Sequence, residues 1–192
     1  MRTFSVVGHL APTGDGFTLD DLPGSGGRMD ILCRCVHAAL SVSHGIRRDA
    51  GIHLILLGPP SPPKDLLLEG SAVRSLSPDE RSTAALLRKA LVLPVGEAFR
   101  ESSPGILVRR GGLSGLIAEG GYAVLSESGR DMRTLPDLPR AFLLSDHLDF
   151  TAEEEEALSG LPRISVGPGV LHADHAITVL QNELDRREAG WR

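Results

Sequence analysis

The sequence predicts an α/β protein with a mostly parallel sheet flanked by helices, and two observations support this prediction. Short runs of Val, Ile and Leu alternate along the chain with longer segments in which apolar residues recur at helical spacing. Several of the short runs are apolar throughout, which is typical of strands buried on both faces of a parallel sheet. With 192 residues the chain has the length of one domain, and we expect residues 1–192 to form a single domain.

The first half of the chain predicts two strands and two helices. Residues 4–8 read as a short buried strand that ends in glycine, and residues 52–57 are a continuous apolar run. Helical spacing of apolar residues extends through 30–44. The sequence SPDE at 77–80 has the form of a capping box with proline at the first helical position, so we expect a helix to begin there and to end near Val92.

The second half predicts four strands and three helices. The sequence TAEE at 151–154 is a second capping box, which opens an acidic helix. The last helix ends near Arg187, and its predicted core stripe consists of Ala176, Ile177, Leu180 and Leu184. The predicted strands are residues 106–110, 122–126, 141–145 and 164–167, and the remaining helix is residues 113–119.

The charge of the chain excludes one class of nucleic-acid binder and leaves another open. A formal net charge of −5 and a pI near 5.8 argue against a coat protein with a broadly basic surface. Residues 24–49 nevertheless carry four arginines against two aspartates. Such a local patch can steer an anionic partner, because the guanidinium group suits phosphate contacts.

The two cysteines predict a reducing compartment. Cys33 and Cys35 are too close in sequence for a structural disulfide and too few for a cysteine zinc site. We expect them to be reduced, buried thiols on a helix, as in a cytosolic protein. The N-terminus has no apolar region of signal type, and no segment reaches the length of a membrane span, so we expect a soluble, cytoplasmic protein.

Three predicted strands run into polar or glycine-rich loops, in the sequences YAVLSESG, AFLLSDH and RISVGPG. In open α/β sheets, ligands bind outside the carboxyl ends of the strands. Three such loops could enclose a nucleoside-sized molecule largely through backbone groups. The sequence therefore predicts a ligand site at this edge of the sheet.

A cluster of His and Asp residues follows the last of these loops. Nitrogen and oxygen donors of this kind are ligands that zinc accepts, so a metal-dependent hydrolase is one alternative. The cluster has no metalloenzyme spacing such as HExxH, and it falls where a helix begins, so its residues also suit a helix start. The cluster comprises His172, Asp174 and His175, with Asp146 and His147 upstream.

Several segments spread along almost the whole chain carry a resemblance to one family. They are LDDLPG at 19–24, GRMDILCRCV at 27–36, SHGIRRD at 43–49, LSPDERSTAALLRKAL at 76–91, SPGILVRRGG at 103–112, GPGVLHADHAI at 167–177 and NELDR at 182–186. GRMDILCRCV and GPGVLHADHAI are the most specific of them. Taken together, these segments resemble the archaeal tRNA pseudouridine N1-methyltransferases (the TrmY family) of the SPOUT superfamily and their bacterial relatives.

The resemblance implies a fold, an assembly and a cofactor. It implies a deep trefoil knot in the C-terminal part, a homodimer, and S-adenosylmethionine bound by the knot loops, with no metal required. The implied RNA partner is tRNA, methylated at position 54 of the T-loop. The residues that correspond to the family's cofactor pattern are Leu125, Ser145, Ser165, Val166, Gly167, Pro168, Gly169, Val170, Leu171 and Ala176.

The reaction implied is an in-line displacement, in which N1 of pseudouridine attacks the methyl carbon of the sulfonium and loses its own proton. Positioning of the two reactants supplies most of such catalysis. An arginine can stabilise the developing negative charge, and a carboxylate or imidazole can take the proton. We expect Arg28, Asp30 and Arg34 on the substrate side, with His44 behind them.

Four positions depart from the family pattern. Ser145 and Asp149 stand where glycine is expected, Ala176 stands in place of cysteine, and Gln181 in place of histidine. Glycine is used where the backbone closely approaches a ligand, so Ser145 adds a side chain at a sensitive point. These departures keep a second alternative open, an RNA-binding or ligand-binding module that has lost or altered methyl transfer.

Overall fold

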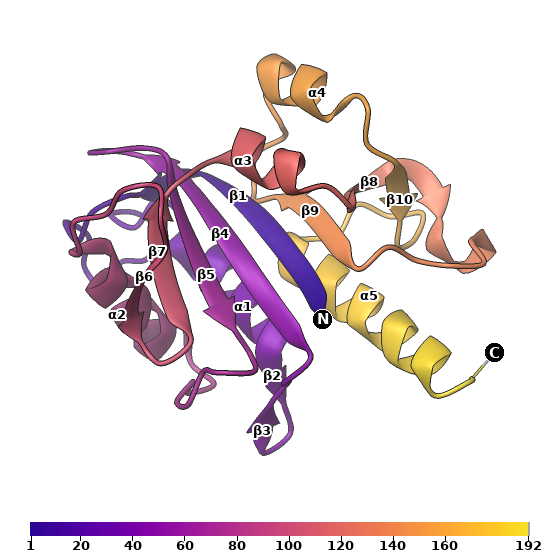
Figure 1. Ribbon diagram of the computed structural model, residues 1–192, viewed down its shortest axis with the longest axis horizontal. Helices are drawn as coiled ribbons and strands as arrows, with labels where there is room; N and C mark the ends of the chain where they lie inside the picture. Colours follow the sequence, from indigo (N-terminus) through magenta and orange to yellow (C-terminus); the bar gives the residue numbers. More distant parts are fainter. Residues whose placement is uncertain (192) are drawn as a thin grey trace.

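The computed structural model describes residues 1–191 and contains one eight-stranded sheet in the order β10-β8-β9-β1-β4-β5-β7-β6 (Figure 1). The strands from β10 to β4 pair in parallel, and β5, β7 and β6 continue the sheet in antiparallel fashion. The strands are β1 (Arg2–Pro12), β4 (Ala50–Gly58), β5 (Lys64–Glu69), β6 (Arg100–Ser103), β7 (Ile106–Arg110), β8 (Tyr122–Asp131), β9 (Ala141–Ser145) and β10 (Arg163–Ser165).

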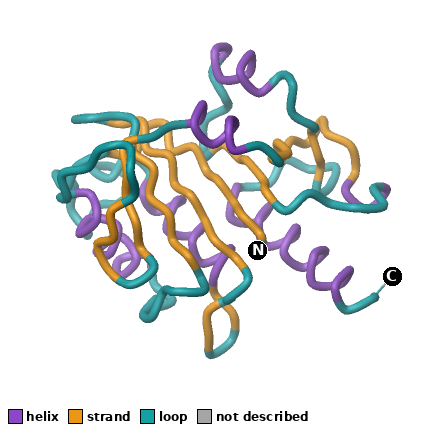
Figure 2. Tube along the Cα trace, in the orientation of Figure 1, coloured by secondary structure: helices purple, strands orange, loops and turns teal. Residues whose placement is uncertain are grey.

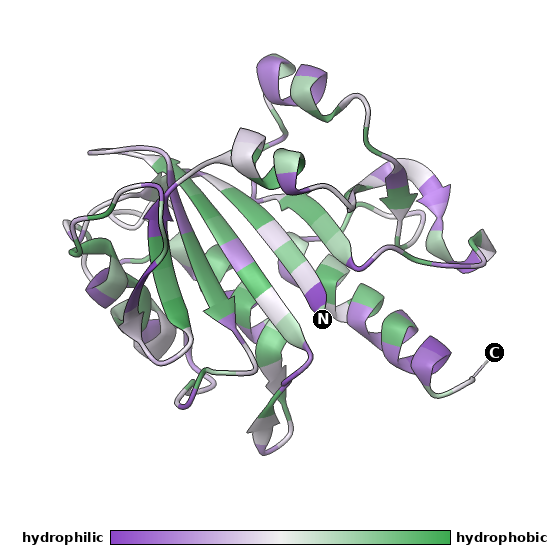
Figure 3. Cartoon of the chain, viewed as in Figure 1, coloured by the Kyte–Doolittle hydropathy of each residue, from purple (hydrophilic) through white to green (hydrophobic). Residues whose placement is uncertain are grey.

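Helices cover both faces of the parallel half of the sheet. Phe4 and Val6 of β1 point into the larger core, which is formed with the helices α1 and α5, whereas Val7 joins a smaller core with α3 and α4. This alternation follows from the two-residue period of a strand. Hydrophobic residues are accordingly concentrated in the central strands (Figure 3). The helices are α1 (Met29–Leu40), α2 (Glu80–Leu91), α3 (Leu113–Glu119), α4 (Ala152–Leu158) and α5 (Ala173–Glu188).

The α/β class is confirmed, and so are most of the predicted elements. The strands β7 and β9 and the helix α3 have the predicted bounds, and the predicted stripe of α5 is buried. The TAEE capping box is present, with Thr151 as the N-cap of α4. Cys33 and Cys35 are buried free thiols on α1, as predicted, and burial raises the pKa of both.

The antiparallel edge of the sheet was not predicted. The strand β5 follows β4 after the proline-rich loop at 59–63, which is too short for a parallel crossover, so the chain can only turn back. The sequence of β6, RESS, has no apolar residue, and its place at the outer edge of the sheet explains why none is needed.

Two predicted helix boundaries are wrong. The helix expected over 30–44 ends at Leu40, and the chain then forms a two-stranded hairpin of β2 (Ser41–Val42) and β3 (Gly45–Ile46), which extends beyond the main sheet (Figure 2). The N-cap of α2 is Asp79 rather than Ser77, because the Asp79 carboxylate accepts a hydrogen bond from the backbone N–H of Ser82 at 2.7 Å.

A buried arginine ties the start of the sheet to the end of the last helix. The side chain of Arg2 is 2% exposed and donates to Gln181 at 2.7 Å, to Asp185 at 2.6 Å and to Glu188 at 2.7 Å. Its Nε lies 3.3 Å from a carboxylate oxygen of Asp49. Arg2 therefore holds α5 against β1.

No helix among residues 1–191 is long and apolar enough to cross a membrane.

Replacing Arg2 with Ala should destabilise the fold by about 2–3 kcal/mol, because it removes a buried side chain together with its hydrogen bonds to Gln181, Asp185 and Glu188. The measurement is urea unfolding of the two proteins. The matched control is Arg140→Ala, since Arg140 is 65% exposed and pairs with the same Glu188, and its loss should cost about 0–1 kcal/mol. Equal effects of the two substitutions would contradict the role given to Arg2.

Candidate functional site

A cavity of about 670 Å³ opens where the parallel strands β8, β9 and β10 end. This is the edge at which the loops after the strands were expected to bind a ligand. All the predicted cofactor residues except Pro168 line the cavity, and Pro168 lies between two lining glycines. The predicted residues that line it are Leu125, Ser145, Ser165, Val166, Gly167, Gly169, Val170, Leu171 and Ala176.

The glycine-rich loop after β10 is held in shape by a serine. The Ser165 hydroxyl donates to the Gly167 carbonyl at 2.6 Å and accepts from the Gly167 N–H at 3.2 Å. A side chain added at Gly167 or Gly169 would meet no atom within 4 Å. The space next to this backbone is therefore open to a ligand.

The departures from the family pattern are accommodated locally. The Ser145 hydroxyl donates to the Leu148 carbonyl, so the added side chain is used within the turn that follows β9. Ala176 is 8% exposed and lines the cavity with a smaller side chain than cysteine. The Gln181 amide donates to the Ala39 carbonyl at 2.8 Å and accepts from Arg2, so it needs both a donor and an acceptor. Asp149 lines the cavity and is exposed.

A histidine that was not predicted from the sequence contacts one of the residues that line the cavity. His9, on β1, places Nδ1 3.0 Å from Asp146 and Nε2 3.0 Å from Glu154 of α4. Asp146 lines the cavity and also accepts from the backbone N–H groups of His9 and Leu148. A lone histidine within a strand gives no sequence signal, and its two acceptors lie more than 130 positions away.

The His9 ring is a cation at neutral pH. Both of its nitrogens face carboxylate oxygens, which only accept hydrogen bonds, so both nitrogens must carry protons. The hydrogen bond to Asp146 raises the pKa of His9; burial opposes this, and Glu154 adds to it, so that the pKa reaches about 9. Burial alone would raise the pKa of Asp146, but the hydrogen bond from His9 holds it below its usual value.

Three of the four predicted substrate-side residues lie together at the start of α1. Arg28 donates to both oxygens of Asp30 at 3.0 Å, and Arg34 donates to the same carboxylate at 3.2 Å. Nε of Arg34 lies 3.7 Å from Asp174, whose neighbour Ala173 lines the cavity. The three residues therefore form a cluster beside the cavity mouth.

The backbone at this cluster is unusual. Arg28 has a φ of 67°, in the left-handed region that non-glycine residues rarely adopt. Gly27 before it has a φ of 53°, and a Cβ there would lie 2.0 Å from the Leu10 carbonyl oxygen. The turn places the Arg28 guanidinium against Asp30. Backbone strain of this kind tends to occur at functional sites.

Asp30 is suited to hold the two guanidiniums. Burial alone would raise its pKa, but the hydrogen bonds and charges of Arg28 and Arg34 lower it below the usual value. The group is thus an ionised carboxylate with its acceptor positions occupied, which makes it a weak proton acceptor.

His44 does not join this cluster. It lies in the turn between β2 and β3, beyond the C-terminus of α1, with a φ of 61°. The 12 residues of α1 separate it from the N-terminal end of the helix by about 18 Å. His44 therefore does not stand behind the arginines as expected, because the whole length of α1 lies between it and the turn that holds Arg28.

The four arginines expected to form one basic patch over residues 24–49 lie at two separate places, one at each end of α1. Arg47 pairs with Asp185 at 2.6 Å, and Arg48 donates to the carbonyl groups of Gly70 and Val73. These two arginines secure loops at the far end of the sheet. Only Arg28 and Arg34 remain beside the cavity.

The His/Asp cluster of the sequence does not converge as a metal site would. Nε2 of His175 lies 3.7 Å from Asp174, and the His172 and His175 rings meet edge to face. Across residues 1–191, no group of three or more His, Cys, Asp or Glu side chains is arranged to hold a metal ion. Asp174 is buried in the first turn of α5, so the cluster begins a helix.

Comparisons with known proteins bear on this site. The family described as "Putative SAM-dependent RNA methyltransferase" matches residues 1–189. The tRNA (pseudouridine(54)-N(1))-methyltransferase of Methanospirillum hungatei is 51% identical, over 100% of both chains. The proteins of the same name from Methanocorpusculum labreanum and Haloferax volcanii are 48% and 46% identical, over 97% and 96% of this chain and 98% and 96% of their own. These relatives are archaeal, and the resemblance noted in the sequence is confirmed.

The fold is similar to that of a solved structure. The crystal structure of Archaeoglobus fulgidus Nep1 bound to S-adenosylhomocysteine covers 98% of each chain with a TM-score of 0.63. Its sequence is 13% identical, so this likeness concerns the fold alone.

The His9 ion pairs should make stability depend on alkaline pH. The folded-state pKa of about 9 lies above the usual value near 6.5, so the stabilisation is complete below about pH 6.5 and is lost as the pH rises through 9. Allowing for solvent screening, we expect a loss of about 1–2 kcal/mol in the free energy of unfolding. Urea unfolding between pH 6 and pH 10 measures it. A His9→Gln variant should lack this component, and an unchanged pH profile in that variant would refute the assignment.

Proposed function

This chain belongs to the family of SAM-dependent RNA methyltransferases that matches residues 1–189, and we propose that it methylates N1 of pseudouridine 54 in tRNA, with S-adenosylmethionine as the methyl donor. One observation carries the proposal. The residues that correspond to the family's cofactor pattern, although spread over residues 125–176, surround a single cavity beside an arginine cluster. Relatives named for this activity match the chain over its whole length.

The cavity fits the cofactor in size and in chemistry. Its volume of about 670 Å³ lies within the usual range for small-molecule sites. The backbone at Gly167 and Gly169 leaves room for a ligand, and apolar side chains such as Leu125 and Val166 can cover an adenine ring. When bound, S-adenosylmethionine supplies an activated methyl group on a positively charged sulfur. The carboxylate of Asp146, braced by His9, lines the same cavity.

The arginine cluster supports the substrate side of the proposal. Arg28 and Arg34 present guanidiniums beside the cavity, where they can bind a phosphate or stabilise negative charge that develops on the base. Asp30 holds both groups in place through three hydrogen bonds and acts as a positioning residue. His44, in the distant hairpin, has no part in this arrangement.

We further propose the finer features that the family resemblance implies. The chain forms one SPOUT domain over residues 1–192, has a trefoil knot in its C-terminal part, and acts in the cytoplasm as a homodimer. Support for a dimer comes from apolar residues exposed near the cavity mouth. Val170 is 82% exposed, Leu171 42% and Leu148 41%, and a second copy could cover them.

Methylation should require pseudouridine at position 54. We expect the purified protein to add one methyl group, with S-adenosylmethionine, to a tRNA transcript that carries pseudouridine there, and none to the same transcript with uridine. Nucleoside mass spectrometry distinguishes the two products. A folded protein that binds S-adenosylmethionine but leaves the modified tRNA unmethylated would refute the proposed reaction.

Filling the cofactor cavity should weaken cofactor binding while the fold is retained. The Gly167→Val side chain would project into open space, so we expect affinity for S-adenosylmethionine to fall about tenfold or more in calorimetric titration. Gly160→Val is the matched control, because Gly160 is also unobstructed but lies outside the cavity. Similar affinities of the two variants would contradict the assigned cofactor position.

Removing one arginine should impair methyl transfer and spare cofactor binding. We expect Arg28→Gln to lower kcat/KM for tRNA by about 10²-fold, because it removes a cation that stabilises negative charge on the substrate. Calorimetric affinity for S-adenosylmethionine should stay at the wild-type value. Normal turnover in this variant would exclude Arg28 from the substrate side.

A further inference from the structure

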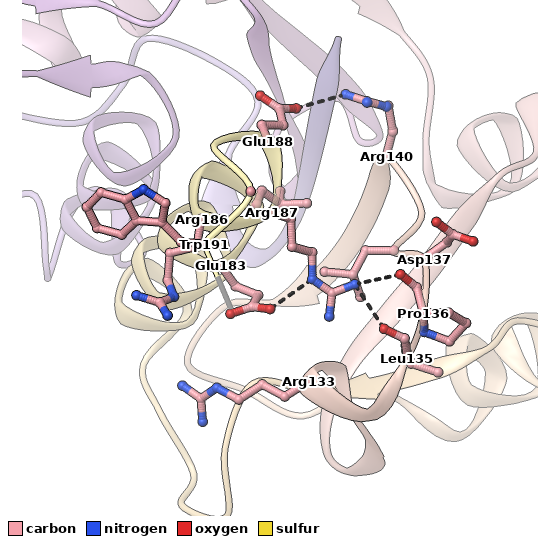
Figure 4. A pocket seen from close by; sticks show the side chains of 13 residues that line it. Arg133, Leu135, Pro136, Asp137, Arg140, Glu183, Arg186, Arg187, Glu188 and Trp191 are labelled. Carbon is pink, nitrogen blue, oxygen red and sulfur yellow. Dashed lines mark hydrogen bonds and ion pairs between the residues drawn. The ribbon is translucent and has the colours of Figure 1, made fainter.

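A second cavity, of about 780 Å³, lies at the other end of α5 (Figure 4). The segment at 133–140 forms one wall, and residues 183–191 form the other. We refer to it as the C-terminal groove. The cofactor cavity includes Ala176 of α5, and the groove begins at Glu183, so about 10 Å of helix separates the two. The groove is thus a separate surface of the molecule.

The shape of the C-terminal groove is set by one arginine. Arg187 donates to the carbonyl groups of Met132 at 2.7 Å and Leu135 at 2.9 Å, and its Nε bonds Glu183 at 2.8 Å. These bonds fasten the segment at 133–140 to α5, as Figure 4 shows for Leu135 and Glu183. The floor beneath is apolar, with Leu135, Leu138 and Leu184. The groove is therefore built in advance of any ligand.

The charges on its walls leave positive groups available. Glu183 is engaged by Arg187, and Glu188 by the buried Arg2 at 2.7 Å. The guanidinium of Arg133 has no hydrogen-bond or ion-pair partner among residues 1–191, since the hydrogen bond that Arg133 donates is from its backbone N–H to Asp131. Arg140 is 65% exposed and has one ion pair, with Glu188 at 3.3 Å. Glu183 and Glu188 are thus paired within the fold, whereas Asp137, the third acidic residue of the groove, is exposed and has no ion-pair partner among residues 1–191. Arg133 and Arg140 face solvent in the same groove.

An exposed aromatic ring stands at the edge of the same groove. Trp191 is 67% exposed, and the guanidinium carbon of Arg186 lies 5.9 Å from its ring centroid. A large, exposed indole is uncommon on the surface of a protein with only seven aromatic residues. Its flat face can stack on a nucleobase, which is the usual way in which proteins hold unpaired bases.

We propose that the C-terminal groove binds the tRNA outside the methylated nucleotide, with Arg133 and Arg140 on backbone phosphates and Trp191 stacked on an unpaired base. This inference rests on the proposed function and identifies a second surface for its substrate. A chain with a net charge of −5 repels a polyanion over much of its surface, so RNA must be held where exposed cations gather. Four arginines line this groove against three acidic residues. Arginines and an aromatic ring that line one groove are the groups by which proteins hold the phosphates and the base of a single-stranded nucleotide.

The test compares a double variant, Arg133→Gln with Arg140→Gln, with a matched control, Arg74→Gln with Arg81→Gln. The control also removes two exposed arginines, and Arg81 has one ion pair, with Asp20, as Arg140 has with Glu188. The probe is the tRNA transcript with pseudouridine at position 54, and its affinity is measured by fluorescence anisotropy at several salt concentrations.

We expect the double variant to bind this tRNA about tenfold more weakly than the control, with a log–log salt slope shallower by about two. Trp191→Ala should weaken binding about tenfold at every salt concentration, whereas Trp191→Phe should restore much of it. Affinity for S-adenosylmethionine should not change. In methylation assays the KM for tRNA should rise while kcat is kept.

Equal tRNA affinity of the double variant and the control would overturn the proposal. A change in molecular mass by light scattering, with tRNA affinity unchanged, would also overturn it and would make the groove an interface between copies. Binding is measured apart from catalysis, so the two proposals fail separately. A protein that binds tRNA through the groove but transfers no methyl group would refute the reaction and support the groove.

Discussion

The packing of α5 against α1, beneath the parallel strands, is the contact on which both candidate surfaces depend. The N-terminal end of α5 supplies Ala173 and Ala176 to the cofactor cavity, and the C-terminal end of α5 forms a wall of the C-terminal groove. Apolar residues of α5 are buried along the length between, and Gln181 and Arg2 add hydrogen bonds where the helix passes α1 and β1. A shift of this helix would therefore change both sites together.

The electrostatics of the site follow from buried or half-buried carboxylates, each held by cations. His9 neutralises Asp146 behind the cavity, Arg28 and Arg34 neutralise Asp30 at its mouth, and Arg2 joins Asp185 at the far end of α5. A buried carboxylate without a cation would take up a proton and lose its hold on its neighbours. In this acidic chain, the carboxylates therefore determine the positions of the cationic side chains that pair with them.

The family departures become intelligible when their contacts are considered. The side chain at Ser145 is used within the turn after β9, where its hydroxyl meets the Leu148 carbonyl. The Gln181 amide accepts a hydrogen bond from Arg2 and donates one to the Ala39 carbonyl. A neutral imidazole at this position would have to accept with one ring nitrogen and donate with the other. Ser145 and Gln181 thus have local partners, while Ala176 and Asp149 line the cavity, so none of the four by itself argues for a fold that has lost its cofactor.

The sequence by itself determined the features that depend on near neighbours along the chain. These include the α/β class, the strands β7 and β9, the helix α3 and the glycine-rich loop after the last strand. Only the tertiary structure decided the antiparallel edge with β5 and β6, the position of His44 in a hairpin, and the joining of His9 with Asp146 and Glu154. The reason is that helical periodicity and capping motifs depend on interactions between residues a few positions apart. The other features depend on contacts between segments that are distant in sequence, which form only when the strands pair.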